Sequence, residues 1–316
     1  MEYFAGSGEI VRSLHKPVVT VGNFDGLHIG HRAIIDTVVT RARAIHGHAV
    51  VYTFEPHPIK ILRPARAPGL LTTIEQKVEL IEQAGIDALV VEKFDADFAR
   101  TTAEEFIQNI LYERIRPVEV YVGYDFHFGR DREGSMRLLI ELGPRLGFSV
   151  TIIPEVTVGG RDVNSTRIRK LLEDSHVEDA AQLLGRPYRV RGRVIEGARR
   201  GRTLGFPTAN LEPENEILPA AGVYAGRLRF LDEGDPASGD EYPTVSNVGY
   251  RPTFEGRGSL QAEAHLIGFD GDLYGRRIEL SFSDHLRPEQ QFTGVDALRE
   301  QIAADVDQAR SLLELP

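Results

Sequence analysis

The sequence of 316 residues contains no cysteine. This absence excludes disulfides, thiolate nucleophiles and cysteine-ligated zinc. Any chemistry must therefore use His, Asp, Glu, Ser, Thr, Lys and Arg side chains, backbone amides and added metal ions.

The sequence also lacks long apolar runs and a basic excess. No stretch approaches the roughly 20 apolar residues that span a bilayer, and the start "MEYFAGSGEIVRSLHKP" lacks the features of a secretory signal. The formal net charge is −10, whereas general nucleic-acid binders usually carry a basic excess. We therefore expect a cytoplasmic protein with no membrane and no nucleic-acid partner, although local basic loops stay open.

What is present suggests two domains, since a domain has about 100–200 residues. In the first half, strand-like and helix-like segments alternate. Strands are predicted at residues 17–22, 48–54, 88–94, 118–123 and 149–156. Two intervening helices open with a predicted capping box, formed by Thr72 with Glu75 and by Thr102 with Glu105. This alternation predicts a doubly wound parallel sheet with its ligand crevice beyond the carboxyl ends of the strands.

The second half has a different pattern. After about residue 185, short segments with partial period-two patterning are separated by Gly, Pro and Asp, which predicts an antiparallel sheet or small barrel. A final helix, from about Val295 to Leu313, carries its apolar side chains on one face. We place the join near "LLGRPY", which gives domains at 1–184 and 185–316.

The stretch "GNFDGLHIGH", residues 22–31, places two histidines three residues apart, where the first predicted strand turns into the first helix. A helix N-terminus suits phosphate, and two imidazoles there could donate hydrogen bonds to phosphoryl oxygens. Gly22, Gly26 and Gly30 permit close backbone approach. A zinc site would need ligands that the nearby sequence does not offer, and incidental loop histidines are the other alternative. The strand–turn–helix setting favours phosphate binding.

This stretch resembles the histidine motif of the nucleotidyltransferase superfamily. "FEPHP" (54–58), "VGYDFHFGRDREG" (122–134) and "NSTRIRKLL" (164–172) resemble companion motifs of one branch, the adenylyltransferase module of the bacterial bifunctional riboflavin kinase/FAD synthetase family. The resemblance implies a Rossmann-like domain that adenylylates FMN. The implied ATP-binding residues are Gly22, Asn23, Phe24, His28, His31, Ser165, Thr166 and Arg169, with His28 and His31 catalytic. The implied flavin pocket contains Asp125 and Phe128.

Two of these motifs have simpler readings when they are taken alone. "NSTRIRK" would sooner be a plain capped helix than a phosphate site, and the aromatic residues near Phe128 could be core. Asn164 stands where the family usually has serine, and His127 where arginine is more common. The first departure leaves a phosphate contact of that side chain open.

In the second half, "EGARRGRTLGFPTAN" (196–210) combines glycines with arginines, a composition that can wrap phosphates. A lone loop of this kind would sooner be a solvated basic hairpin. Thr208 and Asn210 lie two residues apart, so on a strand both point to one side and offer neutral oxygens that suit Mg²⁺. Glu263 is, by itself, a polar residue on a strand-like segment, whose commonest place is a solvated face.

This loop, with "PAAGVYAG" (219–226), "SNVGYRPTF" (246–254), "EAHLIGFDGDLYG" (263–275) and "LRPEQQF" (286–292), resembles the riboflavin kinase family. The resemblance implies a six-stranded antiparallel (split) barrel with a terminal helix. It also implies that Thr208 and Asn210 coordinate Mg²⁺ and that Glu263 is the base for the ribityl hydroxyl. The implied ATP-binding residues are Gly197, Arg202, Gly205, Pro207 and Thr208.

We therefore predict a bifunctional enzyme that phosphorylates riboflavin to FMN and adenylylates FMN to FAD, with ATP and Mg²⁺. One alternative is a nucleotidyltransferase for another phosphate acceptor, with a barrel that only binds flavin or regulates. Another is a non-enzymatic flavin or nucleotide sensor. The sequence leaves a weak homo-oligomer open.

Overall fold

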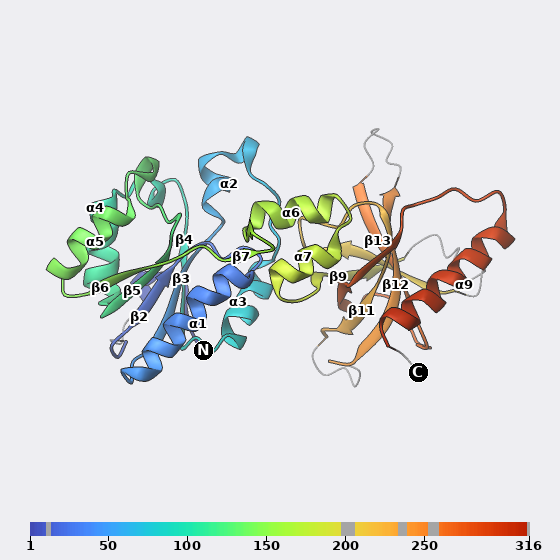
Figure 1. Ribbon diagram of the computed structural model, residues 1–316, viewed down its shortest axis with the longest axis horizontal. Coiled ribbons are helices and arrows are strands. Elements are labelled where there is room, and N and C mark those ends of the chain that lie inside the picture. The colour runs from blue at the N-terminus through green and yellow to red at the C-terminus, as the bar shows by residue number, and fades with distance from the viewer. Residues whose placement is uncertain (11–13, 197–205, 233–238, 252–258, 315–316) are drawn as a thin grey trace. The chain divides into compact units, whose positions relative to one another are not determined.

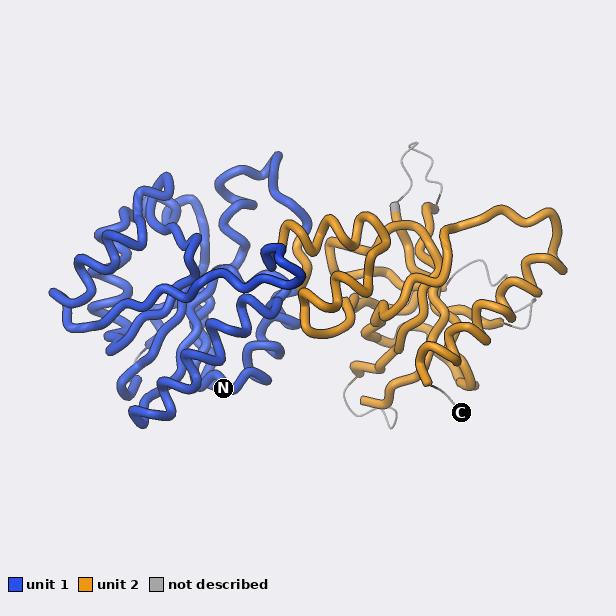
Figure 2. Tube along the Cα trace, viewed as in Figure 1, with its two compact units in different colours: residues 1–69, 73–164 blue, residues 70–72, 165–316 orange. Residues whose placement is uncertain are grey.

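The computed structural model describes residues 1–10, 14–196, 206–232, 239–251 and 259–314. The chain forms two compact units (Figure 2). Unit 1 comprises residues 1–69 and 73–164, and unit 2 comprises residues 70–72 and 165–316. Each is described by itself below. Within the described residues, no helix combines the length and apolarity needed to cross a bilayer.

Unit 1 is built on a parallel sheet (Figure 1). Its strands are β1 (Glu2–Phe4), β2 (Val18–Val21), β3 (Ala49–Glu55), β4 (Ala88–Lys93), β5 (Glu119–Gly123) and β6 (Ser149–Ile153). They lie in the order β1-β4-β3-β2-β5-β6, and each neighbouring pair is parallel. All of β2 is buried, as expected for a strand covered on both faces. A hairpin of β7 (Thr157–Val158) and β8 (Arg161–Asp162) follows.

Helices cover both faces of this sheet. They are α1 (Ile29–Ala44), α2 (Pro58–Leu62), α3 (Ile74–Gln83), α4 (Ala103–Glu105), the π-type helix η4 (Phe106–Ile115) and α5 (Met136–Arg145). Short 3-10 turns are η1 (Ser7–Glu9), η2 (Pro64–Arg66), η3 (Phe98–Arg100) and η5 (Arg130–Arg132).

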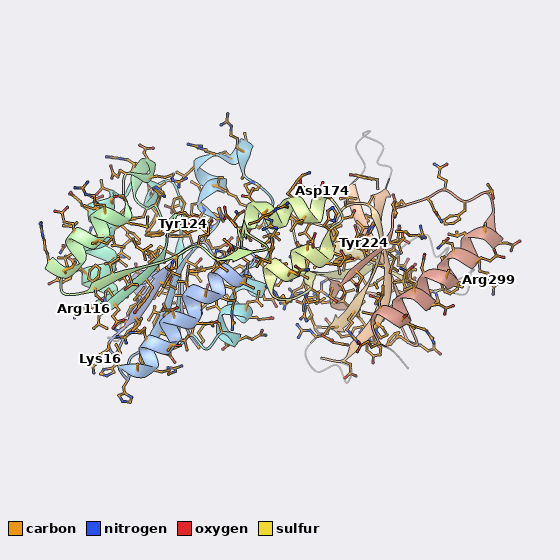
Figure 3. All side chains as sticks on the ribbon, viewed as in Figure 1. Lys16, Arg116, Tyr124, Asp174, Tyr224 and Arg299 are labelled. Carbon is orange, nitrogen blue, oxygen red and sulfur yellow. The ribbon has the colours of Figure 1, made fainter. Side chains whose placement is uncertain are left out.

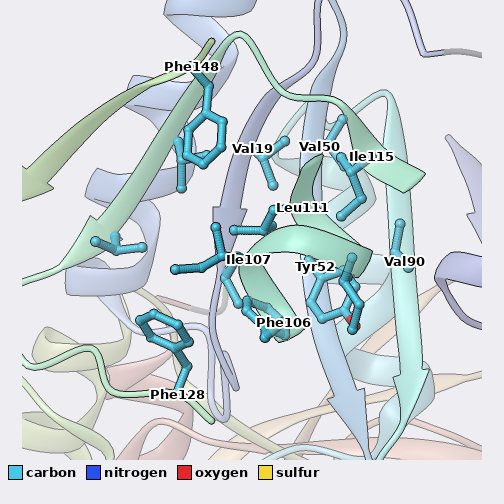
Figure 4. Close-up of a cluster of buried hydrophobic side chains, with 14 of the residues drawn as sticks. Val19, Val50, Tyr52, Val90, Phe106, Ile107, Leu111, Ile115, Phe128 and Phe148 are labelled. Carbon is cyan, nitrogen blue, oxygen red and sulfur yellow. The ribbon is translucent and has the colours of Figure 1, made fainter. Parts of the chain in front are cut away.

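Within the described residues of unit 1, two hydrophobic clusters hold the helices to the sheet. One packs η4 and α5 on one face and includes Val19, Val50, Val90, Phe106, Ile107 and Leu111 (Figure 4). The other packs α1 and α3 and includes Val18, Val51, Leu89, Ile35, Val38 and Ile81. Alternate residues of β2, β3 and β4 therefore serve opposite cores, which is why these central strands are mostly apolar.

The strand order reverses beside β2. From β2, the strands β3 and β4 extend to one side, whereas β5 and β6 extend to the other. Open parallel sheets bind ligands beyond the carboxyl ends of their strands at such a point. The residues that follow β2 and β5 are the histidine motif and the stretch from Tyr124 onward.

Unit 2 contains an antiparallel barrel. Its strands are β9 (Tyr188–Ile195), β10 (Thr208–Pro213), β11 (Gly222–Phe230), β12 (Glu241–Arg251), β13 (Ser259–Leu266) and β14 (Arg277–Phe282), with β15 (Asp284–Arg287) beside them. The order is β12-β13-β10-β9-β14-β11, and pairing of β11 with β12 closes the six-stranded ring within the described residues. Strand β15 adds to β11.

Among the described residues of unit 2, the helices α6 (Ser165–Glu173), α7 (Val177–Leu184) and α9 (Val295–Leu312) accompany the barrel. Val306 and Ala309 of α9 pack against Val223, Ala225 and Val245 of the barrel. Both predicted architectures, a parallel sheet followed by a barrel with a terminal helix, are confirmed.

One predicted helix start is wrong by a residue. The capping box that opens α3 is formed by Thr73 with Gln76, because the Thr73 hydroxyl accepts from the Gln76 amide and the Gln76 side chain accepts in return. The predicted pair was Thr72 with Glu75. The box of Thr102 with Glu105 is confirmed at the start of α4.

Candidate functional site

The two histidines of the 22–31 motif form the start of α1. His28 is the N-cap residue, and its Nδ1 accepts a hydrogen bond from the backbone N–H of His31 at 3.3 Å. A ring that accepts at Nδ1 carries its proton on Nε2 and is neutral. The imidazoles stack with centroids 3.6 Å apart and ring planes 18° apart. The motif therefore gives two neutral aromatic donors at a helix N-terminus.

His31 is held neutral by its surroundings. Burial of its ring, together with the nearby His28 and the positive charge of Lys77, holds its pKa well below the ordinary value of 6.5. Its Nδ1 atom is buried and has no hydrogen-bond partner within the described residues. A buried polar atom without a partner is costly and calls for an explanation. A bound polar ligand would provide one.

The shape of the turn depends on tight packing around these rings. Phe24 and Leu27 are almost fully buried and adopt positive φ angles of 51° and 39°. Such angles are rare for bulky residues and occur mainly where the surroundings enforce them, often at functional sites. The Phe24 ring lies edge-on to His31 at 5.3 Å. A Cβ on Gly30 would lie 3.1 Å from His28 Nδ1, so glycine leaves the room that this ring occupies.

The sequence analysis assigned no role to three charged groups of this region: Lys77, whose charge acts on His31, and Asp25 and Glu55, whose charges act on Lys77. Asp25 and Lys77 are each 3% exposed, and Glu55, at the end of β3, is half-buried. Desolvation lowers the pKa of the Lys77 ammonium, whereas the charges of Glu55 and Asp25 oppose that shift. No local signal distinguishes Lys77 from a solvated helix lysine, because its burial depends on how α3 packs.

The segment after β5 lies beside the same helix. A Cβ on Gly123 would be 3.4 Å from Asp125 Oδ1 and 3.5 Å from Ile34 of α1. Asp125 is thus brought near the first turns of α1. Phe128 instead lies in the core, 5.5 Å from the Phe106 ring. Its expected place in a flavin pocket stays a prediction, and its packing matches the alternative of a core aromatic.

The remaining expected residues of the first site are placed as follows. Asn23 is exposed, and its carbonyl accepts a hydrogen bond from the Thr53 hydroxyl at 3.3 Å. Ser165 is the first residue of α6, and Thr166 is exposed on its first turn. Arg169 is half-buried one turn later. Because α6 belongs to unit 2, their approach to His28 stays a prediction.

A second constellation lies on the barrel. Asn210 of β10 is directly opposite Glu263 of β13, and Glu263 is directly opposite Asn247 of β12. Opposed residues share a face, so an amide, a carboxylate and a second amide form one row across three strands. Thr208 lies on the same face, two residues before Asn210. Asn210 is buried and Glu263 is exposed, which leaves the carboxylate accessible.

Asn247 extends this row and was missed by the sequence analysis. Its Nδ2 donates to Glu289 Oε1 at 3.4 Å. That oxygen would be only 2.2 Å from a Cβ on Gly249, so glycine allows Glu289 to lie over the strand. The pairing of β12 with β13 identifies Asn247, and the sequence carries no local signal for this pairing.

The segment that leads into β10 is held against β13. The Pro207 carbonyl oxygen lies 2.9 Å from His265 Nδ1, and the Phe206 ring packs edge-on to the same imidazole at 5.3 Å. Gly197, Arg202 and Gly205, which the sequence predicts to bind ATP, lie outside the described residues.

Comparison with known proteins matches both halves of the chain to enzymes. The family model for FAD synthetase matches residues 11–167, and that for riboflavin kinase matches residues 184–313. A bifunctional riboflavin kinase/FMN adenylyltransferase of Escherichia coli (strain K12) is 38% identical over 298 residues, 94% of this chain and 93% of the relative. Its counterpart from Pseudomonas fluorescens is 38% identical over 311 residues, 96% of this chain and 97% of the relative. The chain belongs to this bifunctional family.

A solved structure agrees with the fold along the whole chain. It is described as a macrolide-efflux protein from Streptococcus pneumoniae, with a TM-score of 0.84, 28% sequence identity and 98% coverage of both chains. The two family models leave residues 168–183 unassigned, whereas the division into compact units falls after residue 164. The expected domain boundary at 184/185 therefore stays a prediction.

Proposed function

We propose that the chain makes FAD from riboflavin in two steps, one at each constellation. Unit 2 transfers the γ-phosphoryl group of ATP to riboflavin and forms FMN. Unit 1 transfers the adenylyl group of a second ATP to FMN and releases pyrophosphate. Family membership gives both activities. The observation that carries the assignment to residues is the pair of separate constellations, stacked histidines at a helix start and an opposed Asn210–Glu263 pair.

In the adenylylation step, an oxygen of the FMN phosphate attacks the α-phosphorus of ATP, and the bond to the pyrophosphate oxygen breaks. Negative charge grows on the phosphoryl oxygens during this exchange. The imidazole N–H groups of His28 and His31 and the first N–H groups of α1 donate hydrogen bonds to that charge. Ser165, Thr166 and Arg169 add ATP contacts, and Gly22, Asn23, Phe24 and Asp125 border the substrates; their motifs support these roles.

In the kinase step, Glu263 takes the proton of the ribityl 5′-hydroxyl of riboflavin. The 5′-oxygen attacks the γ-phosphorus of ATP, and ADP leaves. A positioned carboxylate contributes about 10²–10⁴-fold to such a transfer. The exposure of Glu263 allows a substrate to reach it. Asn210, directly opposite, fixes the place of the phosphates relative to this base.

The donor atoms on β10 fit Mg²⁺. Thr208 and Asn210 offer two neutral oxygens on one face of a strand, and Mg²⁺ usually takes few protein ligands together with phosphates and water. Among the described residues, no group of three His, Asp or Glu side chains could hold a metal alone. When bound with ATP, the ion would offset phosphate charge. We propose these two residues as its protein ligands.

Two substitutions test the division of labour. His28→Ala should abolish FAD formation from FMN and ATP, and should leave FMN formation from riboflavin near normal. Glu263→Gln should lower FMN formation by at least about 10²-fold and leave FAD formation from supplied FMN near normal. Products are separated by chromatography after incubation with Mg²⁺–ATP. If either variant lost both activities while still folded, the assignment would be wrong.

The same assay separates the alternatives. A nucleotidyltransferase with a passive barrel would form no FMN from riboflavin, and a sensor would bind without forming either product. The streptococcal structure is described as a macrolide-efflux protein, and we do not propose an efflux role for this chain. A cytoplasmic location and a weak homo-oligomer stay predictions.

A further inference from the structure

Lys77 is a buried cation at the edge of the adenylylation site. It lies on the first turn of α3 and is 3% exposed, whereas lysine is rarely buried unless a charged group accompanies it. The opposite charges that act on it are Glu55, at the end of β3, and Asp25, within the motif after β2. Both positions are at the carboxyl edge of the sheet, where the histidine motif lies.

The histidines themselves supply no full positive charge. His28 accepts at Nδ1 from the His31 amide and is therefore neutral. His31 is stacked on it with the ring centroids 3.6 Å apart, and its Nδ1 atom is buried, so protonation would place a charge in a crowded, partly desolvated position. The positive charge of Lys77 also lowers the pKa of His31 and so favours its neutral form. Within unit 1, these residues therefore combine two neutral donors with a buried cation.

Charge balance favours a catalytic use for this cation. Transfer of an adenylyl group releases pyrophosphate, whose negative charge exceeds what neutral donors and half a unit of helix charge can offset. A buried ammonium beside the donors acts through a medium of low dielectric constant and so affects phosphate strongly. Its burial is costly, and a ligand anion would offset that cost.

We propose that Lys77 supplies, from unit 1, a fixed positive charge that stabilises the phosphates of ATP and the leaving pyrophosphate next to the neutral pair His28 and His31, in addition to Arg169. This inference rests on the adenylyltransferase function proposed above. The competing role is structural: Lys77 would only compensate the charges of the buried Asp25 and the half-buried Glu55.

The test compares Lys77→Met and Lys77→Arg in the full chain. The matched control is Lys16→Met, because Lys16 is exposed and precedes the amino end of β2, at the opposite edge of the sheet (Figure 3). For each protein, FAD formation, FMN formation, thermal unfolding and calorimetric binding of Mg²⁺–pyrophosphate are measured. FMN formation serves as the internal control for intact unit 2.

Lys77→Met should lower kcat for FAD formation at least tenfold and weaken pyrophosphate binding at least tenfold, with FMN formation unchanged. Lys77→Arg should retain more of both properties, and Lys16→Met should match the parent protein. If folded Lys77→Met bound pyrophosphate and formed FAD within twofold of the parent, or lost only thermal stability, the proposal would be overturned. If Lys77→Met does not fold, Lys77→Gln decides by the same readouts.

The variant His28→Ala, measured in parallel, distinguishes failure of the Lys77 proposal from failure of the proposed adenylyltransferase site. Loss of FAD formation in His28→Ala with normal activity in Lys77→Met would overturn the role of Lys77 alone. Normal FAD formation in His28→Ala would overturn the proposed site itself.

Discussion

Gly30 shows how one missing side chain shapes the adenylylation site. It lies between the two histidines, and the His28 ring occupies the space where a Cβ would be, 3.1 Å from Nδ1 and 3.2 Å from Cε1. That separation is tighter than ordinary van der Waals contact, so the ring would have to move by a few tenths of an ångström. The glycine is therefore needed for the position of the imidazole.

Gly30→Ala should consequently lower FAD formation by about tenfold, since displacement of a catalytic group by 1 Å can cost about 10²-fold. FMN formation should not change. Gly8→Ala is the control, because a Cβ at Gly8 has no atom within 4 Å. Both activities are measured by product chromatography. An unchanged rate of FAD formation in Gly30→Ala would show that the His28 ring adapts without loss.

For single residues, the sequence predicts the histidine motif but does not predict the role of the buried Lys77 charge. The two histidines and their glycines lie on consecutive residues, so the strand–turn–helix pattern exposes them. Lys77 is 46 residues beyond His31 in sequence, and only tertiary packing brings it near. The local sequence also cannot decide which threonine forms the capping box of α3, because Thr72 and Thr73 each precede an acceptable partner by three residues.

At the scale of elements, α9 is held to the barrel by a buried ion pair. Arg287 of β15 donates from Nε to Asp305 Oδ1 at 2.9 Å and from a terminal nitrogen to Oδ2 at 2.8 Å. The Asp305 side chain is 3% exposed, and Gln301 also donates to it. Glu289, two residues after Arg287, contacts Asn247 in the kinase row. The pair therefore fixes both the helix and the start of the segment that reaches that row.

Asp305→Ala should lower the free energy of unfolding of unit 2 by about 3–5 kcal/mol, because it leaves a partly buried guanidinium without its partner. Asp307→Ala on the exposed side of the same helix should change it by no more than about 0.5 kcal/mol. Urea unfolding followed through FMN formation measures both. Equal stabilities of the two variants would contradict the role of the pair.

Elements differ in how well sequence pattern predicts them. The five longer strands of unit 1 are rich in apolar and β-branched residues, and they were predicted to within one residue of their observed ends, apart from the carboxyl end of β6, which was predicted three residues too far. Strand β1 was not predicted, because three residues at a sheet edge carry too little pattern. The row of Asn210, Glu263 and Asn247 depends on long-range register between strands, which a single sequence does not specify.

At the scale of the whole molecule, the assignment of α6 and α7 is the open question. Their helical pattern resembles the first half, so sequence reasoning placed them before the boundary at 184/185. In the structure they belong to unit 2. The Ala220 amide donates to the Leu172 carbonyl at 2.9 Å, and the His285 amide donates to Glu178 at 2.6 Å. Tertiary contacts therefore attach these helices to the barrel, and local pattern cannot show this.

A fragment of residues 165–316 should therefore be more stable than one of residues 185–316. The shorter fragment loses the buried side chains of α6 and α7, which are Ile168, Leu172, Val177, Ala180, Leu183 and Leu184. Each large apolar side chain contributes about 1.5–3 kcal/mol when fully buried, so the loss of even two such contacts costs about 3–6 kcal/mol.

Thermal unfolding and FMN formation compare the fragments fairly, because both lack residues 70–72, whose Leu71 carbonyl accepts from Asn215. We expect the longer fragment to form FMN and the shorter to unfold at lower temperature or to aggregate. Equal stability would place the boundary at 184/185, since α6 and α7 would then contribute nothing to the barrel. A difference of several kcal/mol would place it at 164/165 and would make the two helices part of the kinase unit.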